Sequence, residues 1–274
     1  MDFNLLETPC AFFAELLQQI RTSRQRIILS ALYLGASLSH EKQLLDCLIE
    51  ALDRVPDLEL GLIFDYSRST RRDQHSCITA LTELVRRYPN RVSTQLYKMP
   101  QIDRLPFSLP TPLDEMIAVY HLKFMVFDSN VLLTGANLSE EYFTSRQDRY
   151  FMFKDATLLA TFLAEIAKTI SMYAHKLTDS GCFLPPELPH SNEEAARLRS
   201  VLNSYCSAQD SSFAFQKNFD CVFEEKIKAA DAKEDTKEFI EVIPLLQYAD
   251  QNICDESVVV IKLLEERKWT KVSC

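Results

Sequence analysis

The sequence lacks several patterns that would place it in common functional classes. No run of about 18 apolar residues occurs in its 274 residues, so any contact with a membrane is expected to be peripheral. The eight cysteines include no C-x-x-C pair and no Cys/His spacing typical of a metal site, so we expect reduced thiols, no metal and no disulfide framework. A net charge of −9 disfavours neutralisation of a phosphate backbone, which argues against nucleic acid as a partner.

A nucleotide-binding loop and a targeting leader are also missing. The segment ALYLGASL, residues 31–38, holds one glycine and no Gly-Lys-Ser/Thr, so a buried strand followed by a turn is expected there and not a P-loop. The first residues, MDFNLLETPC, are acidic and show no Arg-rich amphipathic leader, so no transit peptide is visible.

Residues 1–178 alternate between patterns typical of helix and of strand, which predicts an α/β fold with a central mixed β-sheet flanked by helices. The expected helices span residues 8–22, 40–54, 73–88 and 155–178, and the expected strands span 25–33, 57–65 and 91–98, with a hairpin at 119–135. Residues 179–236 are predicted to be a linker that contains a Pro-rich loop and a short helix from Asn192 to about Ser204. Residues 237–274 are predicted to begin an incomplete second domain, with a strand from Phe239 to Leu246 and a helix from Glu256 to Glu266.

The most informative stretch is HLKFMVFDSNVLLTGANLSEEYFTSRQDRY, residues 121–150. A buried strand is expected over 121–127, and because side chains alternate along a strand, His121 and Lys123 would then share a face. Asp128 falls in the turn at the end of this strand, and residues 131–134 are expected to return as the second strand of a hairpin.

These residue types fit a phosphodiester ligand. Lys123 and Asn137 would hold the non-bridging oxygens, while His121, neutral near pH 7, would attack phosphorus or move a proton. The plain alternative is that a lone histidine in a strand is packed or solvent-facing, since a His-x-Lys pair alone is weak evidence. His40-Glu41-Lys42 with Asp46 is a near miss of this kind, and we expect it to be a solvated helix start because positions i and i+2 of a helix do not share a face.

The pattern His121-x-Lys123, Asp128 and Gly135 resembles the HKD motif of the phospholipase D superfamily. Its surroundings, GANLSEEYFTSRQDRY, are similar to the eukaryotic phosphatidylglycerophosphate synthase branch, as are RQRIILSALYLG (24–35) and FDYSRSTRR (64–72). The resemblance covers about residues 5–178. The wider superfamily usually has Ser after the motif glycine, whereas this branch shares the Ala136-Asn137 form seen here, which argues for a synthase over a nuclease.

The resemblance implies a phospholipase D-like sandwich that transfers a phosphatidyl group from CDP-diacylglycerol to glycerol 3-phosphate without a cofactor. It also implies a peripheral protein of the mitochondrial inner membrane. By the same resemblance, His121 is the nucleophile or its proton-handling partner, Lys123 clamps phosphate, and Asp128 is a positioning carboxylate.

Three further residues are candidates for the same site. Asp148 would orient the second ring nitrogen of His121, although an ordinary surface ion pair within Gln147-Asp148-Arg149 is the alternative. Arg68 and Arg71 would bind a glycerophosphate or cytidine phosphate, because Arg forks match phosphate oxygens. Ordinary loop solvation is the alternative for both arginines, and the frequency with which charges face water favours it.

The number of motifs limits the chain. Members of the superfamily build one active site from two HKD motifs, so that one histidine attacks and the other protonates the leaving group. Of the five histidines, only His121 has the required surroundings. Either two chains pair as a homodimer or this chain is half an enzyme, and its end resembles a truncation before the second motif. Three hypotheses remain: a phosphatidyltransferase, a phosphodiesterase that hydrolyses its ester, and a non-catalytic fragment that binds partners or lipid.

Overall fold

The computed structural model describes residues 2–35, 39–71, 77–103, 118–209, 247–248 and 253–254. The chain divides into two compact units, Met1–His190 and Ser191–Cys274. In the second unit, α8 spans Asn192–Gln209, and β10 (Gln247–Tyr248) pairs antiparallel with β11 (Ile253–Cys254). The short helix expected from Asn192 is therefore present and longer than predicted, while the strand and helix expected over 239–246 and 256–266 lie outside the described residues.

The first unit is built on a nine-stranded sheet in the order β1-β7-β6-β5-β2-β3-β4-β8-β9. The pairs β2–β3 and β3–β4 are parallel and the other neighbours are antiparallel, so the sheet is mixed as predicted. The strands are β1 (Asp2–Leu6), β2 (Arg26–Ser30), β3 (Glu59–Asp65), β4 (Val92–Tyr97), β5 (Phe124–Phe127), β6 (Asn130–Thr134), β7 (Tyr150–Lys154), β8 (His175–Leu177) and β9 (Phe183–Leu184).

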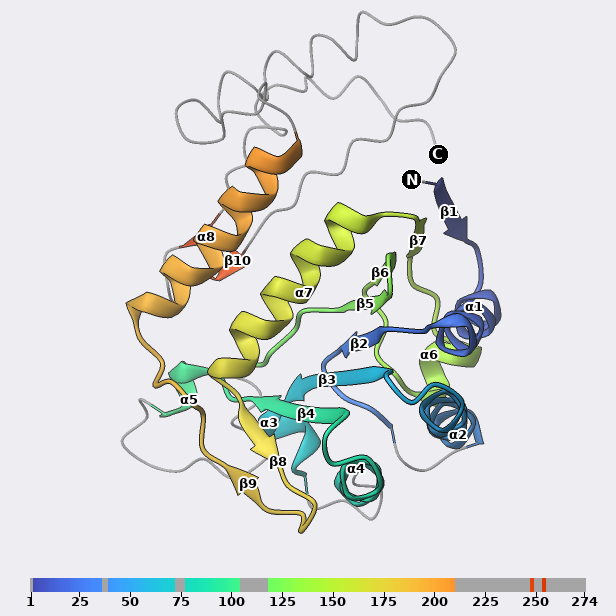
Figure 1. Ribbon diagram of the computed structural model, residues 1–274, viewed down its shortest axis with the longest axis horizontal. Helices are drawn as coiled ribbons and strands as arrows, with labels where there is room; N and C mark the ends of the chain where they lie inside the picture. Colours follow the sequence, from blue (N-terminus) through green and yellow to red (C-terminus); the bar gives the residue numbers. More distant parts are fainter. Residues whose placement is uncertain are drawn as a thin grey trace, which may run out of the picture. The chain divides into compact units, whose positions relative to one another are not determined.

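Helices cover both faces of this sheet (Figure 1). Helix α7 packs against β2, β4, β5 and β6 on one face, while α1, α2 and α4 share the core cluster on the other. The helices are α1 (Pro9–Thr22), α2 (Ser39–Arg54), α3 (Tyr66–Ser69), α4 (Cys77–Arg87), α5 (Pro100–Asp103), α6 (Glu140–Thr144) and α7 (Thr157–Met172). The predicted α/β class, with helices flanking a central mixed sheet, is confirmed.

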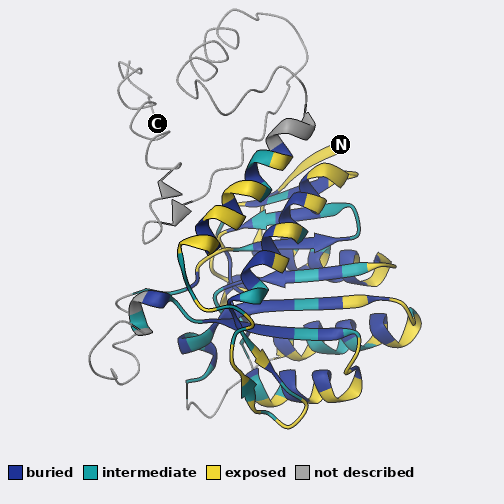
Figure 2. Cartoon of the chain, turned by 60° about the vertical axis from the view of Figure 1, so that its left-hand side comes forward, coloured by how far each residue is buried: buried dark blue, intermediate teal, exposed yellow. Residues whose placement is uncertain are grey.

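The central strands are buried on both faces, as their unbroken apolar runs require (Figure 2). All four residues of β5 are buried, and their neighbours Ile27 and Leu29 of β2 are each 1% exposed. Helix α1 begins where the sequence supplies two start signals: Pro9 occupies the first turn, and the hydroxyl of Thr8 accepts a 3.1 Å hydrogen bond from the amide of Ala11. No helix among the described residues is long and apolar enough to span a bilayer.

Two predicted boundaries were wrong. The helix expected over 155–178 ends at Met172, and His175–Leu177 forms β8, because the chain turns back to pair with β4 through Leu96↔His175 and Gln95↔Lys176. The strand expected over 121–127 begins only at Phe124. Its neighbour β2 ends at Ser30, the residue opposite Phe124, so residues 121–123 have no ladder partner on that side.

Candidate active site

The parallel strands β2, β3 and β4 all finish at the same end of the sheet. We call this end, where their carboxyl termini lie, the site edge. At this edge, Ser30 at the end of β2 pairs with Phe124 at the start of β5, and Thr134 at the end of β6 pairs with Tyr150 at the start of β7. The segments before β5, after β6 and before β7 therefore meet the loops that follow the parallel strands. Ligands of open α/β sheets bind at edges of this kind.

His121 and Lys123 lie in the segment that enters β5 at this edge. The ammonium Nζ of Lys123 donates a 3.2 Å hydrogen bond to the carbonyl oxygen of His121. Although His121 is exposed overall, partial desolvation of the ring and the nearby charge of Lys123 lower its pKa from 6.5. Desolvation also lowers the pKa of Lys123 to about 8, and the opposing charge of Asp148 limits that fall.

These two shifts give the pair complementary protonation states. Near pH 7 the imidazole of His121 is neutral and has a nitrogen lone pair free to act as nucleophile or base, while most Lys123 side chains keep their charge. A neutral nucleophile beside a cation is the combination that attack on an anionic phosphodiester requires.

Asp148 lies against Gly135 and within electrostatic range of Lys123. Its Oδ1 accepts hydrogen bonds from the amide of Gly135 at 3.1 Å and from the amide of Arg149 at 2.6 Å. A Cβ at position 135 would lie 2.8 Å from Asp148 Oδ2, so glycine is required there by close approach. No hydrogen bond joins Asp148 to His121 among the described residues. The bond to Arg149 involves the backbone amide of that residue and is not an ion pair. Asp148 therefore interacts with Gly135 and Lys123 at the site.

Asn137 ties the site loops together. It is 4% exposed, its Oδ1 accepts a 3.3 Å hydrogen bond from the amide of Leu32, and its side chain also interacts with Tyr142, where it opposes the rise in the pKa of that hydroxyl. The isolated bridge between Leu34 and Leu138 continues the same contact between the loops after β2 and β6. In this arrangement the amide of Asn137 is occupied by protein groups.

Asp128, the acid of the motif, lies at the opposite end of β5. Its carboxylate accepts three backbone hydrogen bonds of 2.8–3.0 Å from Arg24, Gln25 and Arg26, which lead into β2. Its φ of 54° is left-handed, as a two-residue hairpin turn between Phe127 and Asn130 requires. Asp128 therefore positions the hairpin and the start of β2, and not the reacting groups.

Arg68 and Arg71 follow β3 at the site edge. The guanidinium of Arg68, in α3, lies 4.6 Å from the centre of the Tyr33 ring, which follows β2. Both arginines are partly buried, and both have further interactions within the protein. Stacking on an aromatic ring helps to hold the guanidinium of Arg68 in place beside the loop that follows β2.

Sequence reasoning missed Ser30 and Asp65 as members of the site. Asp65 is fully buried, and its Oδ2 accepts a 2.7 Å hydrogen bond from the amide of Tyr120, next to His121. Ser30 is also fully buried and donates a 2.9 Å hydrogen bond to the carbonyl of Leu122. For Asp65 the available signal was positional, because this polar residue ends the strand predicted over 57–65. Ser30 lies inside the strand predicted over 25–33, which the structure ends at Ser30, so no such signal marked it.

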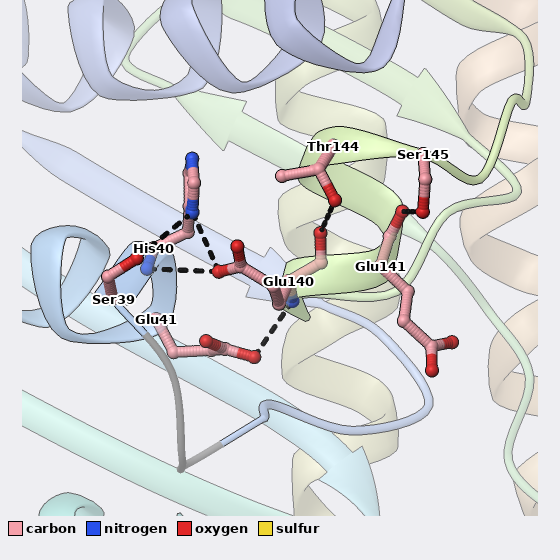
Figure 3. A network of polar contacts seen from close by, with 7 residues as sticks. All are labelled: Ser39, His40, Glu41, Glu140, Glu141, Thr144 and Ser145. Carbon is pink, nitrogen blue, oxygen red and sulfur yellow. Dashed lines mark hydrogen bonds and ion pairs between the residues drawn. The ribbon is translucent and has the colours of Figure 1, made fainter.

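The near miss at His40-Glu41 is a partly buried polar network (Figure 3). Nδ1 of His40 lies 2.6 Å from Oε2 of Glu140, and Oε1 of Glu41 accepts a 2.8 Å hydrogen bond from the amide of Glu140. Glu41 is 2% exposed, and the ring of His40 packs on Phe13 and Phe143. The expectation of a helix was confirmed. The expectation of a solvated start holds for the exposed side chains of Lys42 and Asp46, but it was wrong for Glu41, which α6 covers.

The four cysteines of the first unit are free thiols. Cys10 and Cys182 are exposed, while Cys47 and Cys77 are buried. Burial raises the pKa of Cys77 to about 11, so this thiol stays protonated at neutral pH. Within the described residues, no group of three or more His, Cys, Asp or Glu side chains is arranged to hold a metal ion.

Comparisons with known proteins found relatives by sequence. No protein-family model matches the chain. The chain is 37% identical over 174 residues to the mitochondrial CDP-diacylglycerol–glycerol-3-phosphate 3-phosphatidyltransferase of Gallus gallus, which covers 61% of this chain and 31% of that protein. It is 29% identical to the Bos taurus protein of the same name over 287 aligned residues, covering 98% of this chain and 51% of the relative. The chain therefore spans about half or less of the length of these relatives.

One solved structure similar to the chain is a phospholipase D family member, Nuc from Salmonella typhimurium. It is 13% identical, with a TM-score of 0.48, and the match covers 65% of this chain and 99% of Nuc.

Proposed function

We propose, from the premise that this chain is a homologue of the CDP-diacylglycerol–glycerol-3-phosphate 3-phosphatidyltransferases, that it supplies one half of a phosphatidyl-transfer site. The observation that carries the proposal is the placement of His121 and Lys123 side by side where β5 begins, with Lys123 Nζ 3.2 Å from the carbonyl oxygen of His121. The lowered pKa of His121 supports it, since it favours the neutral imidazole. The donor would be CDP-diacylglycerol, the acceptor glycerol 3-phosphate, and the products CMP and phosphatidylglycerophosphate.

The proposed reaction proceeds in two displacements at phosphorus. A ring nitrogen of His121 attacks the phosphorus that carries diacylglycerol, a P–N bond forms, and the P–O bond to CMP breaks. The primary hydroxyl of glycerol 3-phosphate then attacks the same phosphorus, its proton passes to a base, and the P–N bond breaks to restore the imidazole. Lys123 holds the non-bridging oxygens, whose charge grows in both steps.

The remaining site residues support these steps in distinct ways. Asp148 keeps Lys123 charged and holds Gly135 close, and Asn137 keeps the loops after β2 and β6 in register. Arg68 and Arg71 would bind the phosphate groups that do not react, because glycerol 3-phosphate and the nucleotide both bring additional negative charge.

A second histidine must protonate the leaving CMP and deprotonate the acceptor, since His121 is occupied as nucleophile. We propose that a second copy of this chain, or another protein half, provides it. The same proposal divides the chain into a catalytic domain over residues 1–178, a linker over 179–236 and the start of a second domain over 237–274.

The proposed donor is a lipid, so the site must meet a membrane surface without a spanning helix of the described residues. The Gallus gallus and Bos taurus relatives are mitochondrial by name. We therefore propose peripheral association with the mitochondrial inner membrane.

Product analysis tests the proposal. The purified chain, with its mass determined by light scattering, is incubated with CDP-diacylglycerol vesicles with and without glycerol 3-phosphate. CMP release that requires the acceptor supports transfer, whereas CMP release without it identifies a hydrolase. No CMP under either condition, in a preparation that contains dimers, leaves the non-catalytic hypothesis.

His121→Asn is the matched control for this assay. The exposed side chain can be replaced without disturbing the core, so we expect a folded protein with no turnover and no acid-quenched phosphatidyl adduct. Turnover retained by this variant would contradict the role of His121.

A further inference from the structure

The segment that carries His121 and Lys123 is fixed by side chains where a strand ladder would be expected. Residues 118–123 have no regular secondary structure, and β5 begins only at Phe124. Two buried polar residues at the ends of β2 and β3 provide the missing hydrogen bonds. Side chains thus take the place of the backbone partners that a strand ladder would provide.

Asp65 makes two backbone contacts that point in different directions. Its Oδ2 accepts the 2.7 Å hydrogen bond from Tyr120, and its Oδ1 accepts a 2.7 Å hydrogen bond from the amide of Arg68. One carboxylate at the end of β3 thus joins the segment of His121 to the start of α3, which carries Arg68. Hydrogen bonds to a buried charged group are stronger than neutral ones, so this junction is stiff.

Ser30 holds the same segment from the end of β2. Because its single hydroxyl proton goes to the carbonyl of Leu122, the hydroxyl of Tyr120 donates the second hydrogen bond, at 2.7 Å, to Ser30 Oγ. Burial raises the pKa of Tyr120, so its proton is available for this bond at neutral pH. Residues on both sides of His121 are therefore anchored.

We propose that Asp65 and Ser30 are positioning residues that hold His121 and Lys123 against the site edge, and that Asp65 couples this pair to Arg68. The inference rests on the proposed function only in taking His121 as the reacting group. In this role Asp65 touches no substrate and acts through the backbone of Tyr120.

A spectroscopic titration tests this positioning without any turnover. The imidazole of His121 is followed by NMR across pH 5 to 9, with His121→Asn used to assign its signal. In the unaltered protein the midpoint should lie below 6.5, because the ring is partly desolvated and the charge of Lys123 is close to it. Asp65→Asn removes one of the two acceptor oxygens, so the segment should loosen and the midpoint should rise toward 6.5.

Two controls separate positioning from general stability. Asp53→Asn makes the same chemical change at the opposite edge, where Asp53 Oδ1 accepts a 2.5 Å hydrogen bond from Tyr88, and it should leave the His121 midpoint unchanged. Tyr120→Phe removes the hydroxyl but keeps the bonds from Asp65 to Tyr120 N and from Ser30 to Leu122, so its shift should be smaller than that of Asp65→Asn.

The outcomes are distinct. A folded Asp65→Asn protein with an unchanged His121 midpoint overturns the proposal, even if phosphatidyl transfer is observed. If Asp65→Asn does not fold, Ser30→Ala decides, since it removes only the bonds to Leu122 and Tyr120, and an unchanged midpoint there has the same meaning. A raised midpoint together with no CMP release by a preparation that contains dimers would support positioning while contradicting phosphatidyl transfer by two copies of this chain.

Discussion

At the residue scale, the candidate site shifts the ionisation of its two basic residues in the same direction. His121 and Lys123 begin from 6.5 and 10.5, and desolvation at the sheet edge lowers the pKa of both groups. For His121 this favours the neutral form, which is the reactive one. For Lys123 the same desolvation lowers the pKa to about 8, so this side chain loses its charge as the pH rises above that value.

The predicted pH profile follows from these signs. Turnover by a completed site should fall below the lowered pKa of His121, where the ring is protonated, and above about pH 8, where Lys123 becomes neutral. Each limb should approach about a tenfold loss per pH unit. The measurement is kcat/KM for CMP release between pH 5 and 10.

Lys123→Arg provides the matched variant for the alkaline limb. Because a guanidinium stays charged across this range, the decline above pH 8 should disappear even if the maximal rate falls. A decline at the same pH in Lys123→Arg would assign that limb to a different group.

At the scale of elements, the hairpin and the helices that precede the parallel strands could be predicted because each has a local signature. The turn at Asp128-Ser129-Asn130 and the return strand from Val131 were visible in residue order alone, and the structure begins that strand one residue earlier, at Asn130. Strands β1 and β7 were missed, since their pairing joins Asp2 to Lys154 across most of the unit and no local pattern announces it. The start of β5 was misplaced because the side chains of Asp65 and Ser30 replace a ladder, an effect of tertiary contacts.

Asp128 yields a prediction about this hairpin. Asp128→Ala removes the acceptor of three backbone amides and puts alanine at a φ of 54°, so the free energy of unfolding should fall. The expected loss is about 2–3 kcal/mol, because water replaces part of the lost bonding at the exposed amides. Denaturant unfolding measures it.

Asp128→Asn is the control, because asparagine tolerates the left-handed conformation and keeps one acceptor oxygen. Its loss should be smaller than that of Asp128→Ala. The His121 titration midpoint should stay unchanged in both variants, and a shifted midpoint would show that Asp128 acts on the site across the length of β5.

At the scale of the whole molecule, the sequence predicted the class of fold and the relatives, but the placement of the site residues needed the structure. His121, Lys123 and Asp148 were expected to converge, and the structure brings all three to one edge while pairing Asp148 with Gly135 and not with the imidazole. The direction of a short side chain is set by loops that cross from other strands, so residue spacing alone does not determine it.

Sharing of one site between two copies makes a quantitative prediction. If each site needs His121 from both copies, mixtures with His121→Asn should lose activity as the square of the unaltered fraction, since only unaltered pairs are competent. A linear loss would show that each chain works alone or with a different partner. Subunits are mixed under mild denaturation, refolded, and assayed for CMP release at constant total protein.

The position of Asp128 changes what the motif says about any chain that contains it. The aspartate of the motif lies at one end of β5, and the histidine and lysine lie at the other. The eight residues from His121 to Asp128 therefore combine the groups needed for the reaction with the group needed to fold the hairpin. A chain that lost His121 and Lys123, and with them the reaction, would still need Asp128 to build this hairpin. The histidine and lysine, and not the aspartate, are therefore the residues that distinguish a working site from an inherited scaffold.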